Sequence, residues 1–234
     1  MVESVNRGVI NDPRNQPAYP LTEAAGYLRL SAATLRAWTL GRPYPTTQGE
    51  GHFRPLIRPG SGQPPLLSFS NLIEAHVLRA LRTDHGVSVK ALRQAMEFAE
   101  QKLGIERLLL RPELCSDAGQ VFLDLYGELI NLSASGQLAM RQVLHAHLKR
   151  VTWDDERFPV RLHPFVVGEA ASFGMPIAID PRISFGRLVV ISRGISTAAI
   201  VARIDAGEAV ADLAADYDLS LAEIDDAVLY ERAA

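Results

Sequence analysis

The chain has 234 residues, of which 47% are hydrophobic and 22% are charged, and its formal net charge at pH 7 is −3. This composition is typical of a soluble globular protein and provides enough chain for one large or two modest domains. No apolar run approaches the roughly 18 residues that a membrane-spanning helix needs, and residues 1–20 lack the apolar stretch of a signal peptide. The single cysteine, Cys115, can form no internal disulfide, so we expect a cytoplasmic protein.

Charge is distributed unevenly along the chain. Arginines dominate between Leu21 and Arg82, whereas acidic residues dominate from Asp205 to the end, where Arg232 is the single base. A basic patch attracts phosphate, and an acidic patch repels phosphate and favours cationic protein surfaces. The two ends of the chain are therefore expected to bind different partners.

The N-terminal part has the spacing of a helix-turn-helix. Residues 1–18 lack a hydrophobic period and are expected to form a flexible arm. Two short helices are predicted from Leu21, with Thr22 as the cap of the first helix and Ser31 as the cap of the second, which ends near Gly41.

The second of these helices has the pattern of a DNA-reading helix. Leu35 and Trp38 are expected to be buried and to fix the rotation of the helix. That rotation leaves Thr34 and Arg36 near the outer surface, where a recognition helix meets base edges and phosphates. Thr34 and Arg36 are therefore candidate DNA-binding residues.

A segment rich in Gly and Pro follows and indicates a wing. The stretches FRPLI at 53–57 and PLLSF at 65–69 are predicted to pair as two strands with a flexible tip. Arginines at the end of the second helix and in this wing would bind flanking phosphate without reading sequence, and the candidates are Arg42, Arg54 and Arg58.

Two longer amphipathic helices are predicted next. The first starts with a capping box formed by Asn71 and Glu74 and stops at Gly86. The second runs from Ser88 to Gly104. Their apolar stripes serve either an intramolecular core or a dimer interface, and both alternatives remain open at this point.

The period changes in the middle of the chain. Apolar residues alternate in QVFLDLYGELINL and continue in VLHAHLKRVTW, a pattern that favours antiparallel strands. From Pro176 we expect two further strands with a turn at Phe185-Gly186, and then three short helices. The start of the last helix carries a second capping box, formed by Ser220 and Glu223.

These elements predict an α+β fold, with a winged helix-turn-helix, a small antiparallel β region, and a C-terminal hairpin followed by three helices that resemble a helix-turn-helix. The expected divisions are a flexible arm, a DNA-binding domain, a β-rich middle region and a C-terminal domain, at residues 1–18, 19–104, 105–173 and 174–234.

Motifs of common enzyme classes are absent from the sequence, including G-x-G-x-x-G, the P-loop, H-E-x-x-H and G-x-S-x-G. His145 and His147 lie two apart on a predicted strand, so they would share one face and could begin a metal site. Half-exposed histidines without a metal are the preferred interpretation. We therefore expect no catalytic residues, no metal and no cofactor.

The N-terminal region resembles the winged helix-turn-helix of the MerR family. The resemblance rests on LTEAAGYLRLSAATLRAW, in which Thr34, Leu35, Arg36 and Trp38 match the core of that family's recognition helix, and it extends to LLSFSNLIEAHVLRALRTDHGVSVKAL. It covers roughly the first hundred residues. The segment after the recognition helix is longer than is usual in the family, and no metal-binding cysteine pattern follows, which disfavours a metal sensor.

The C-terminal stretch resembles a small bacterial domain of unknown function that is common in antitoxins encoded beside ribonuclease-like toxins. The matching positions run from the first strand to the last turn, and they are Ile179, Asp180, Pro181, Gly186, Arg187, Ile195, Gly207 and Tyr217. Where the family has G-T-R, this chain has Ser192-Arg193-Gly194, so the arginine stands one place early.

Together the two resemblances are those of a VapB-type antitoxin. They imply a homodimer that represses its own operon and neutralises a PIN-like ribonuclease toxin. Acidic side chains of the last helix would face the basic surface of the toxin, with apolar residues as anchors, and Arg187 or Arg193 would enter its acidic metal site in an alternative docking mode. The acidic and apolar candidates are Leu221, Glu223, Asp225, Asp226, Leu229 and Tyr230.

Two other functions stay open from the sequence. One is a stand-alone MerR-like transcription regulator, whose C-terminal domain serves only dimerisation or ligand sensing. The other is a metal-dependent enzyme that uses His145 and His147.

Overall fold

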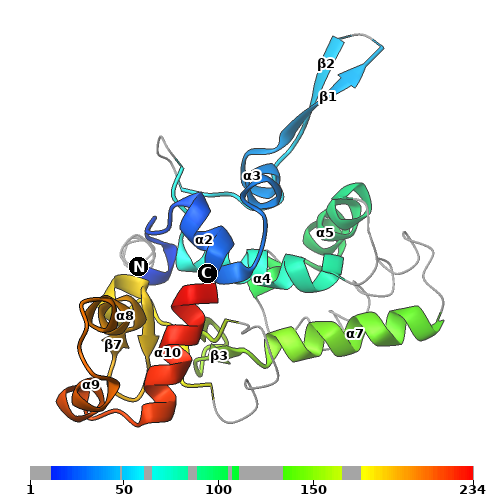
Figure 1. Ribbon diagram of the computed structural model, residues 1–234. Helices are drawn as coiled ribbons and strands as arrows, with labels where there is room; N and C mark the ends of the chain where they lie inside the picture. The colour runs from blue at the N-terminus through cyan, green and yellow to red at the C-terminus, as the bar shows by residue number, and fades with distance from the viewer. Residues whose placement is uncertain are drawn as a thin grey trace, which may run out of the picture.

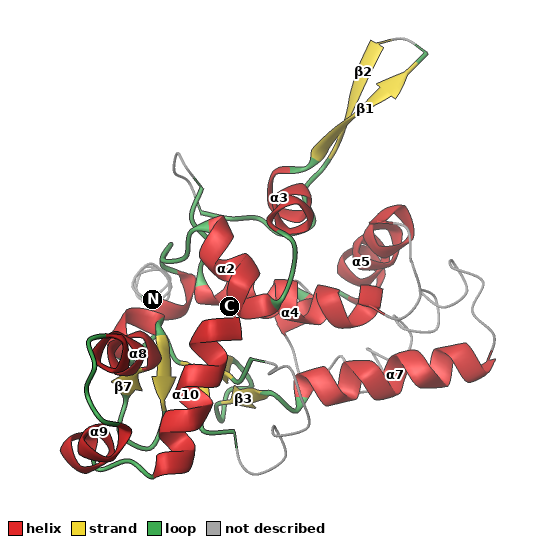
Figure 2. Cartoon of the chain, in the orientation of Figure 1, coloured by secondary structure: helices red, strands yellow, loops and turns green. Residues whose placement is uncertain are grey.

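In the computed structural model, the described residues are 12–47, 49–60, 65–83, 89–104, 107–110, 134–164 and 175–233. They form helices and two antiparallel sheets, which confirms the predicted α+β class. A two-stranded hairpin projects away from the rest of the chain, and a five-stranded sheet lies beside the C-terminal helices (Figures 1 and 2).

Two short helices form the N-terminal module, α2 (Leu21–Leu28) and α3 (Ala32–Leu40). The backbone N–H of Thr34 donates to Oγ of Ser31 over 3.1 Å, so Ser31 caps α3 as predicted. The prediction of a Thr22 cap is wrong, because α2 begins at Leu21 behind a proline and has no side-chain cap. Leu35 and Trp38 are buried, as their spacing predicts.

The hairpin follows α3 directly and consists of β1 (Arg42–Thr46) and β2 (Gly49–Phe53), which pair from Arg42↔Phe53 to Thr46↔Gly49. It therefore starts before the two stretches that were predicted as its strands, and that prediction is wrong. Residues 54–58 form an irregular segment, here called the strap. The N–H groups of Leu56 and Ile57 in this segment donate to the carbonyl of Trp38 over 2.7 and 3.0 Å. These bonds tie the strap to the end of α3 and leave it no strand partner.

A glycine is required where α3 turns into the hairpin. Gly41 has φ +78°, and a Cβ added there would lie 2.1 Å from the carbonyl oxygen of Phe53. The ring of Phe53 in turn stacks on Tyr44, with centroids 4.1 Å apart. The base of the hairpin is therefore closely packed against the end of α3.

The centre of the molecule is α4 (Phe69–Thr83), which contacts α2 and α7 (Ala134–Leu148). Its cap differs from the prediction: Ser68 and Asn71 exchange hydrogen bonds of 3.1 and 3.2 Å, so the helix begins before the predicted capping box. Two other helices accompany it, α5 (Val89–Leu103) and the 3-10 turn η2 (Leu108–Leu110), and α5 has the extent that the sequence predicts.

The predicted β-rich middle region is only partly β. Residues 143–148 belong to α7, so the strand prediction for VLHAHL is wrong. Leu144, His147 and Leu148 are all buried, and their spacing of three and four is that of one helix face. Within the described residues of this region, the strands are β3 (Val151–Trp153) and β4 (Pro159–Leu162). The other predicted strand segment, QVFLDLYGELINL, lies outside the described residues.

The five-stranded sheet has the order β3-β4-β5-β6-β7, with β5 (Ile177–Ile179), β6 (Leu188–Val190) and β7 (Ile195–Ser196), and all neighbours are antiparallel. The pair Leu162↔Ile179 carries the sheet across the boundary that was predicted between the middle and C-terminal regions. Every residue of β5 and β6 is buried, so these two short strands form the centre of the C-terminal core.

Three helices complete the fold: α8 (Thr197–Asp205), α9 (Val210–Tyr217) and α10 (Leu221–Ala233). Both α8 and α10 contact β6. The predicted capping box of α10 is confirmed, since the N–H of Ser220 donates to Glu223 over 2.8 Å and the N–H of Glu223 donates to Oγ of Ser220 over 3.3 Å.

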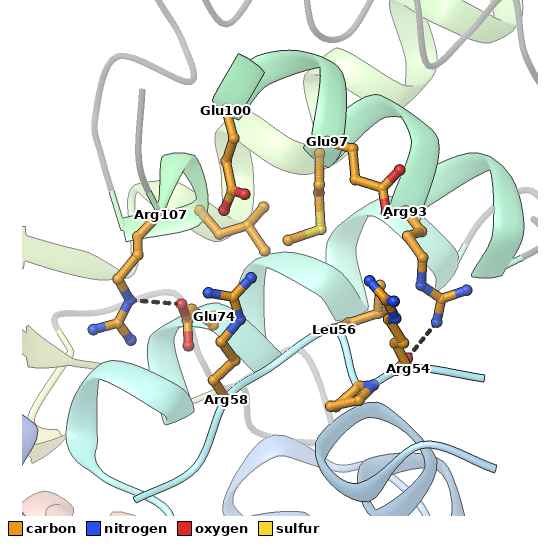
Figure 3. Close-up of a pocket in the computed structure, with 11 residues that line it drawn as sticks. Arg54, Leu56, Arg58, Glu74, Arg93, Glu97, Glu100 and Arg107 are labelled. Carbon is orange, nitrogen blue, oxygen red and sulfur yellow. Dashed lines mark hydrogen bonds and ion pairs between the residues drawn. The ribbon is translucent and has the colours of Figure 1, made fainter. Parts of the chain in front are cut away.

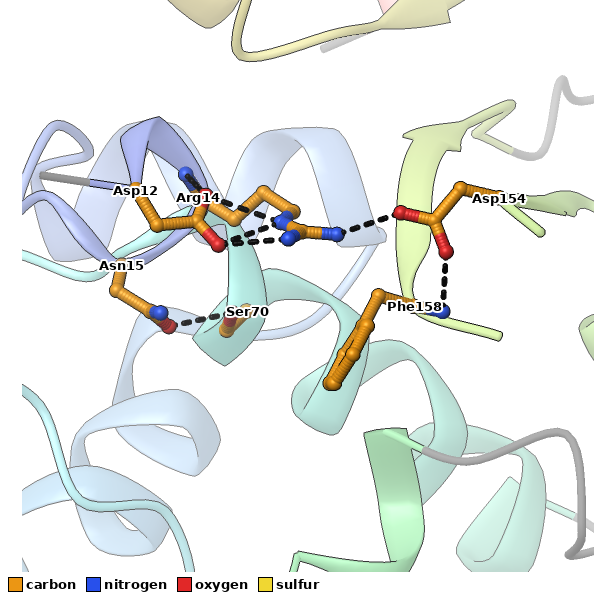
Figure 4. A network of polar contacts seen from close by, with 6 residues as sticks. All are labelled: Asp12, Arg14, Asn15, Ser70, Asp154 and Phe158. Carbon is orange, nitrogen blue, oxygen red and sulfur yellow. Dashed lines mark hydrogen bonds and ion pairs between the residues drawn. The ribbon is translucent and has the colours of Figure 1, made fainter. Parts of the chain in front are cut away.

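The segment before α2 is packed, although the sequence predicts a flexible arm there. It contains the 3-10 turn η1 (Pro13–Asn15). Figure 4 shows Arg14 between two carboxylates, at 2.7 Å from Asp12 and 2.9 Å from Asp154, while Asn15 accepts a hydrogen bond of 2.8 Å from Ser70. Residues 12–18 are thus fixed to the turn that follows β3 and to α4, and residues 1–11 lie outside the described part of the chain.

Candidate functional site

The exposed side chains of α3 and β1 form the candidate nucleic-acid surface. Arg36 is exposed on α3, where buried Leu35 and Trp38 fix the helix rotation. Arg42 is exposed at the first position of the projecting hairpin. Thr34 is half-buried, and its hydroxyl accepts a hydrogen bond of 2.8 Å from Ser31, so it contributes to the helix cap. A rigid helix and a projecting hairpin therefore present two arginines to solvent.

The two remaining candidate arginines lie elsewhere. Arg54 and Arg58 line a cavity of about 360 Å³ between the strap, α4 and α5 (Figure 3). Arg36 and Arg42 do not line it. The expectation that Arg54 and Arg58 bind DNA phosphate stays a prediction, and both side chains are exposed at this cavity.

The acidic C-terminal helices are partly neutralised within the fold. Arg203 on α8 forms ion pairs with Glu208 and with Asp216, the latter at 2.7 Å, and its guanidinium lies over the ring of Tyr217. Hydrogen bonds from Ser192 and from its own capping box lower the pKa of Glu223. These contacts engage the carboxylate of Glu223 within the fold. The remaining acidic candidates for partner binding are therefore the carboxylates that follow it in α10.

Two carboxylates of α10 remain as candidates. Asp225 is exposed, and Asp226 is partly buried. Burial and the charges of Asp225 and Glu223 raise the pKa of Asp226. A cationic partner surface would offset the repulsion between these neighbouring carboxylates.

The apolar candidates differ sharply in exposure. Leu221 is 56% exposed at the start of α10, whereas Leu229 is half-buried. Tyr230 is 5% exposed, and its hydroxyl donates to the carbonyl of Pro164 over 2.7 Å. The prediction of Tyr230 as a surface anchor is therefore wrong, because the ring fills the core and the hydroxyl satisfies a buried carbonyl.

Both candidate arginines of the C-terminal segment have partners within the chain. Arg187 forms an ion pair with Glu23 of α2, whose carboxylate also accepts a hydrogen bond of 2.6 Å from the hydroxyl of Tyr27. Arg193 pairs with the side chain of Asp218 and donates to its carbonyl over 3.2 Å. A partner protein that binds either guanidinium must replace these contacts.

An exposed aromatic residue was missed in the sequence. Phe185 is 93% exposed in the turn between β5 and β6, and its φ of +55° is unusual for a residue with a side chain. The turn is held by Asp180, which is buried and accepts hydrogen bonds of 3.0 Å from the N–H of Arg182 and 3.1 Å from Arg161. A phenylalanine inside a predicted turn was the available signal, since a turn offers no core position.

The two histidines proposed as the start of a metal site do not share a face. His145 is exposed on α7, and His147 is buried 5.0 Å from the ring of His76. The strand that would have aligned them is a helix. Within the ranges that the structure describes, no three His, Cys, Asp or Glu side chains are grouped as metal ligands, and no helix is long and apolar enough to span a membrane.

Comparison with known proteins adds to this geometry. Residues 177–230 match DUF433, a family described as a protein of unknown function. This match agrees with the resemblance found in the C-terminal sequence. The matched residues, here called the DUF433 segment, contain β5, Phe185, α8, α9 and most of α10.

Two curated relatives cover nearly the whole chain. Both come from Mycobacterium tuberculosis (strain ATCC 25618 / H37Rv). The chain is 26% identical over 229 residues to a protein named "Putative antitoxin VapB45", which covers 91% of this chain and 92% of the relative. It is also 26% identical over 233 residues to "Uncharacterized protein Rv2308", with coverage of 93% and 91%.

The fold is shared with a solved structure. The crystal structure of Rv2018 from Mycobacterium tuberculosis superimposes with a TM-score of 0.65 and 22% identity, covering 91% of this chain and 98% of the other. At this coverage the similarity extends well beyond the DUF433 segment.

Proposed function

We propose that this protein is the antitoxin of a type II toxin-antitoxin pair. Its N-terminal module would bind operator DNA and repress the operon, and its DUF433 segment would bind and neutralise a PIN-like ribonuclease toxin. The observation that carries the proposal is the similarity, over 91% of the chain, to the protein named "Putative antitoxin VapB45".

The DNA-binding part of the proposal rests on α2, α3 and the β1–β2 hairpin as a winged helix-turn-helix. Arg36 would reach base edges or phosphates from α3, with Thr34 beside it, while Arg42 would bind flanking phosphate. A homodimer would place two such helices about one DNA turn apart and would therefore prefer an inverted repeat.

The toxin-binding part rests on exposed and partly exposed side chains of the DUF433 segment. Asp225 and Asp226 would accelerate the encounter with a basic ribonuclease surface. Affinity requires apolar anchors that are exposed before binding, and Leu221 and Phe185 meet this condition. An acidic helix on that surface would compete with RNA for it.

Two matched pairs of variants test the two halves separately. For DNA, Arg36→Ala is compared with Arg182→Ala, an exposed arginine of the DUF433 segment, by fluorescence anisotropy on the DNA upstream of the gene. For the toxin, Leu221→Asp is compared with Leu138→Asp, because the two leucines are 56% and 55% exposed, by co-purification with the product of the adjacent gene.

We expect Arg36→Ala to weaken operator binding about tenfold or more without affecting co-purification. Leu221→Asp should abolish co-purification without affecting operator binding. If the adjacent gene product neither binds the wild type nor loses activity in its presence, the antitoxin half is refuted. Operator binding alone would then leave the stand-alone regulator as the better function.

A further inference from the structure

The cavity beside the strap has the size and the chemistry of a small-molecule site. Its volume of about 360 Å³ lies within the range of known ligand pockets. Figure 3 shows the strap arginines facing α5, whose side chains form the opposite wall. Apolar surface lies between the charged groups and comes from Leu56, Met96 and Leu109.

One of the charged pairs in this cavity is complete. Arg107 donates to Glu74 over 3.0 Å, and the other oxygen of Glu74 accepts a hydrogen bond of 3.0 Å from Asn71. Glu74 is thus satisfied within the fold. It closes one end of the cavity and needs no ligand.

The other charged groups of the cavity are not paired with each other. Arg93 donates one hydrogen bond to the carbonyl of Arg54, while its Nε is buried without an acceptor. Within the described part of the chain, the guanidiniums of Arg54 and Arg58 and the carboxylates of Glu97 and Glu100 have no hydrogen bond or ion pair. The four side chains of Arg54, Arg58, Glu97 and Glu100 are exposed to solvent, whereas the Nε of Arg93 is a buried donor that lacks its acceptor.

We propose that this cavity binds a small phosphate monoester that carries hydroxyl groups, of the size of a nucleoside monophosphate. The phosphate would accept hydrogen bonds from Arg54, Arg58 and Arg93, because the guanidinium fork matches phosphate oxygens and three positive charges attract a dianion. The hydroxyl groups would donate to Glu97 and Glu100.

The same carboxylates set the selectivity of the site. A second or third phosphate would extend from the arginines toward Glu97 and Glu100 and would be repelled there. The site is therefore expected to prefer a monophosphate over a triphosphate. A nucleoside without phosphate would leave the arginines unpaired and should bind weakly.

The position of the cavity gives such a ligand a structural consequence. Its strap wall is bonded through Leu56 and Ile57 to the carbonyl of Trp38, near the end of α3. A ligand held between the strap and α5 would therefore fix the end of α3. The binding itself requires neither DNA nor a toxin, so it can be tested independently of the proposed function.

The test measures the affinity of the full chain for AMP, adenosine, inorganic phosphate, ribose 5-phosphate and ATP by isothermal titration calorimetry. We expect AMP and ribose 5-phosphate to bind saturably, and adenosine, phosphate and ATP to bind at least tenfold more weakly. Arg58→Gln should weaken AMP binding about tenfold or more, since a charge-assisted hydrogen bond is lost. Arg182→Gln, an exposed arginine outside the cavity, should leave AMP affinity unchanged.

Glu100→Gln provides a second readout of opposite sign. It removes the repulsion between Glu100 and the additional phosphates of ATP, so the difference in affinity between AMP and ATP should become smaller. The side chains of Arg58 and Glu100 have no partner in the described structure, so equal melting temperatures are expected for both variants. The proposal is overturned if no phosphate monoester binds at millimolar concentration, or if Arg58→Gln binds AMP as the wild type does. Inorganic phosphate that binds as tightly as AMP would overturn the proposal that hydroxyl groups of the ligand donate to Glu97 and Glu100.

Discussion

The buried histidine of α4 should make the protein sensitive to acid. His76 is 1% exposed, its Nε2 lies 3.0 Å from the carbonyl oxygen of His147, and the two rings are 5.0 Å apart. Burial lowers the pKa of His76 from 6.5 to about 3, and electrostatic interactions with His147, Arg79 and Arg150 act in the same direction. The folded protein therefore keeps His76 neutral across the mildly acidic range.

The sign and size of the effect follow from these two pKa values. Below pH 6.5 the unfolded chain binds a proton at His76 that the folded chain does not bind, so the free energy of unfolding falls as the pH falls toward 3. One pH unit corresponds to about 1.4 kcal/mol, so acidification from pH 7 to pH 5 should remove about 2 kcal/mol through this group.

Urea unfolding at pH 5, 6 and 7 measures this effect. His76→Gln removes the titration and can still donate to the carbonyl of His147, and His145→Gln is the control because His145 is exposed on the same helix that carries His147. The stability difference between pH 7 and pH 5 should be about 2 kcal/mol smaller in His76→Gln than in the other two proteins. Equal pH dependence in all three proteins would refute the buried neutral histidine.

Three further substitutions test the C-terminal packing by urea unfolding. Tyr230→Phe leaves the buried carbonyl of Pro164 without its donor and should cost about 1–3 kcal/mol, whereas an unchanged stability would show that water replaces the hydroxyl. Ser220→Ala removes one half of the α10 capping box and should cost about 1 kcal/mol, and a cost near zero would show that this hydrogen bond adds no net stability to α10. Gly186→Ala should cost more than about 1 kcal/mol, because φ is +75° and the new Cβ would lie 2.1 Å from the hydroxyl of Tyr19; a neutral result would show that the turn moves freely.

Local signals in the sequence predicted most of the helices. The caps at Ser31 and Ser220 and the stripe of α5 were read correctly, because each depends on residues within one or two turns. The hairpin was misplaced since its strands contain prolines and glycines, and its position is fixed by distant bonds from the strap to Trp38. Helix α7 was missed because alternation of apolar residues over a few positions is compatible with the period of a helix as well as with that of a strand.

The sequence predicted which regions of the chain carry the candidate site, but not which of their side chains are exposed. The exposure of Arg36 followed from helix phase, whereas the burial of Tyr230 depends on Pro164, which is far away in the sequence. Phe185 is exposed because of the turn in which it lies. Asp180 stabilises that turn by its hydrogen bond from Arg161, and Gly186 by its close approach to Tyr19. Such contacts between distant segments leave no periodic signal.

The two predicted functional ends are joined by contacts of unequal strength. Arg187 is 52% exposed, so its ion pair with Glu23 of α2 contributes little to stability and can be exchanged for a partner's carboxylate at small cost. The turn beside it is different, because Gly186 packs directly under Tyr19 and cannot shift without disturbing the core near α2. A protein that binds the DUF433 segment can therefore replace Glu23 as the partner of the Arg187 guanidinium without displacing the turn that carries Phe185.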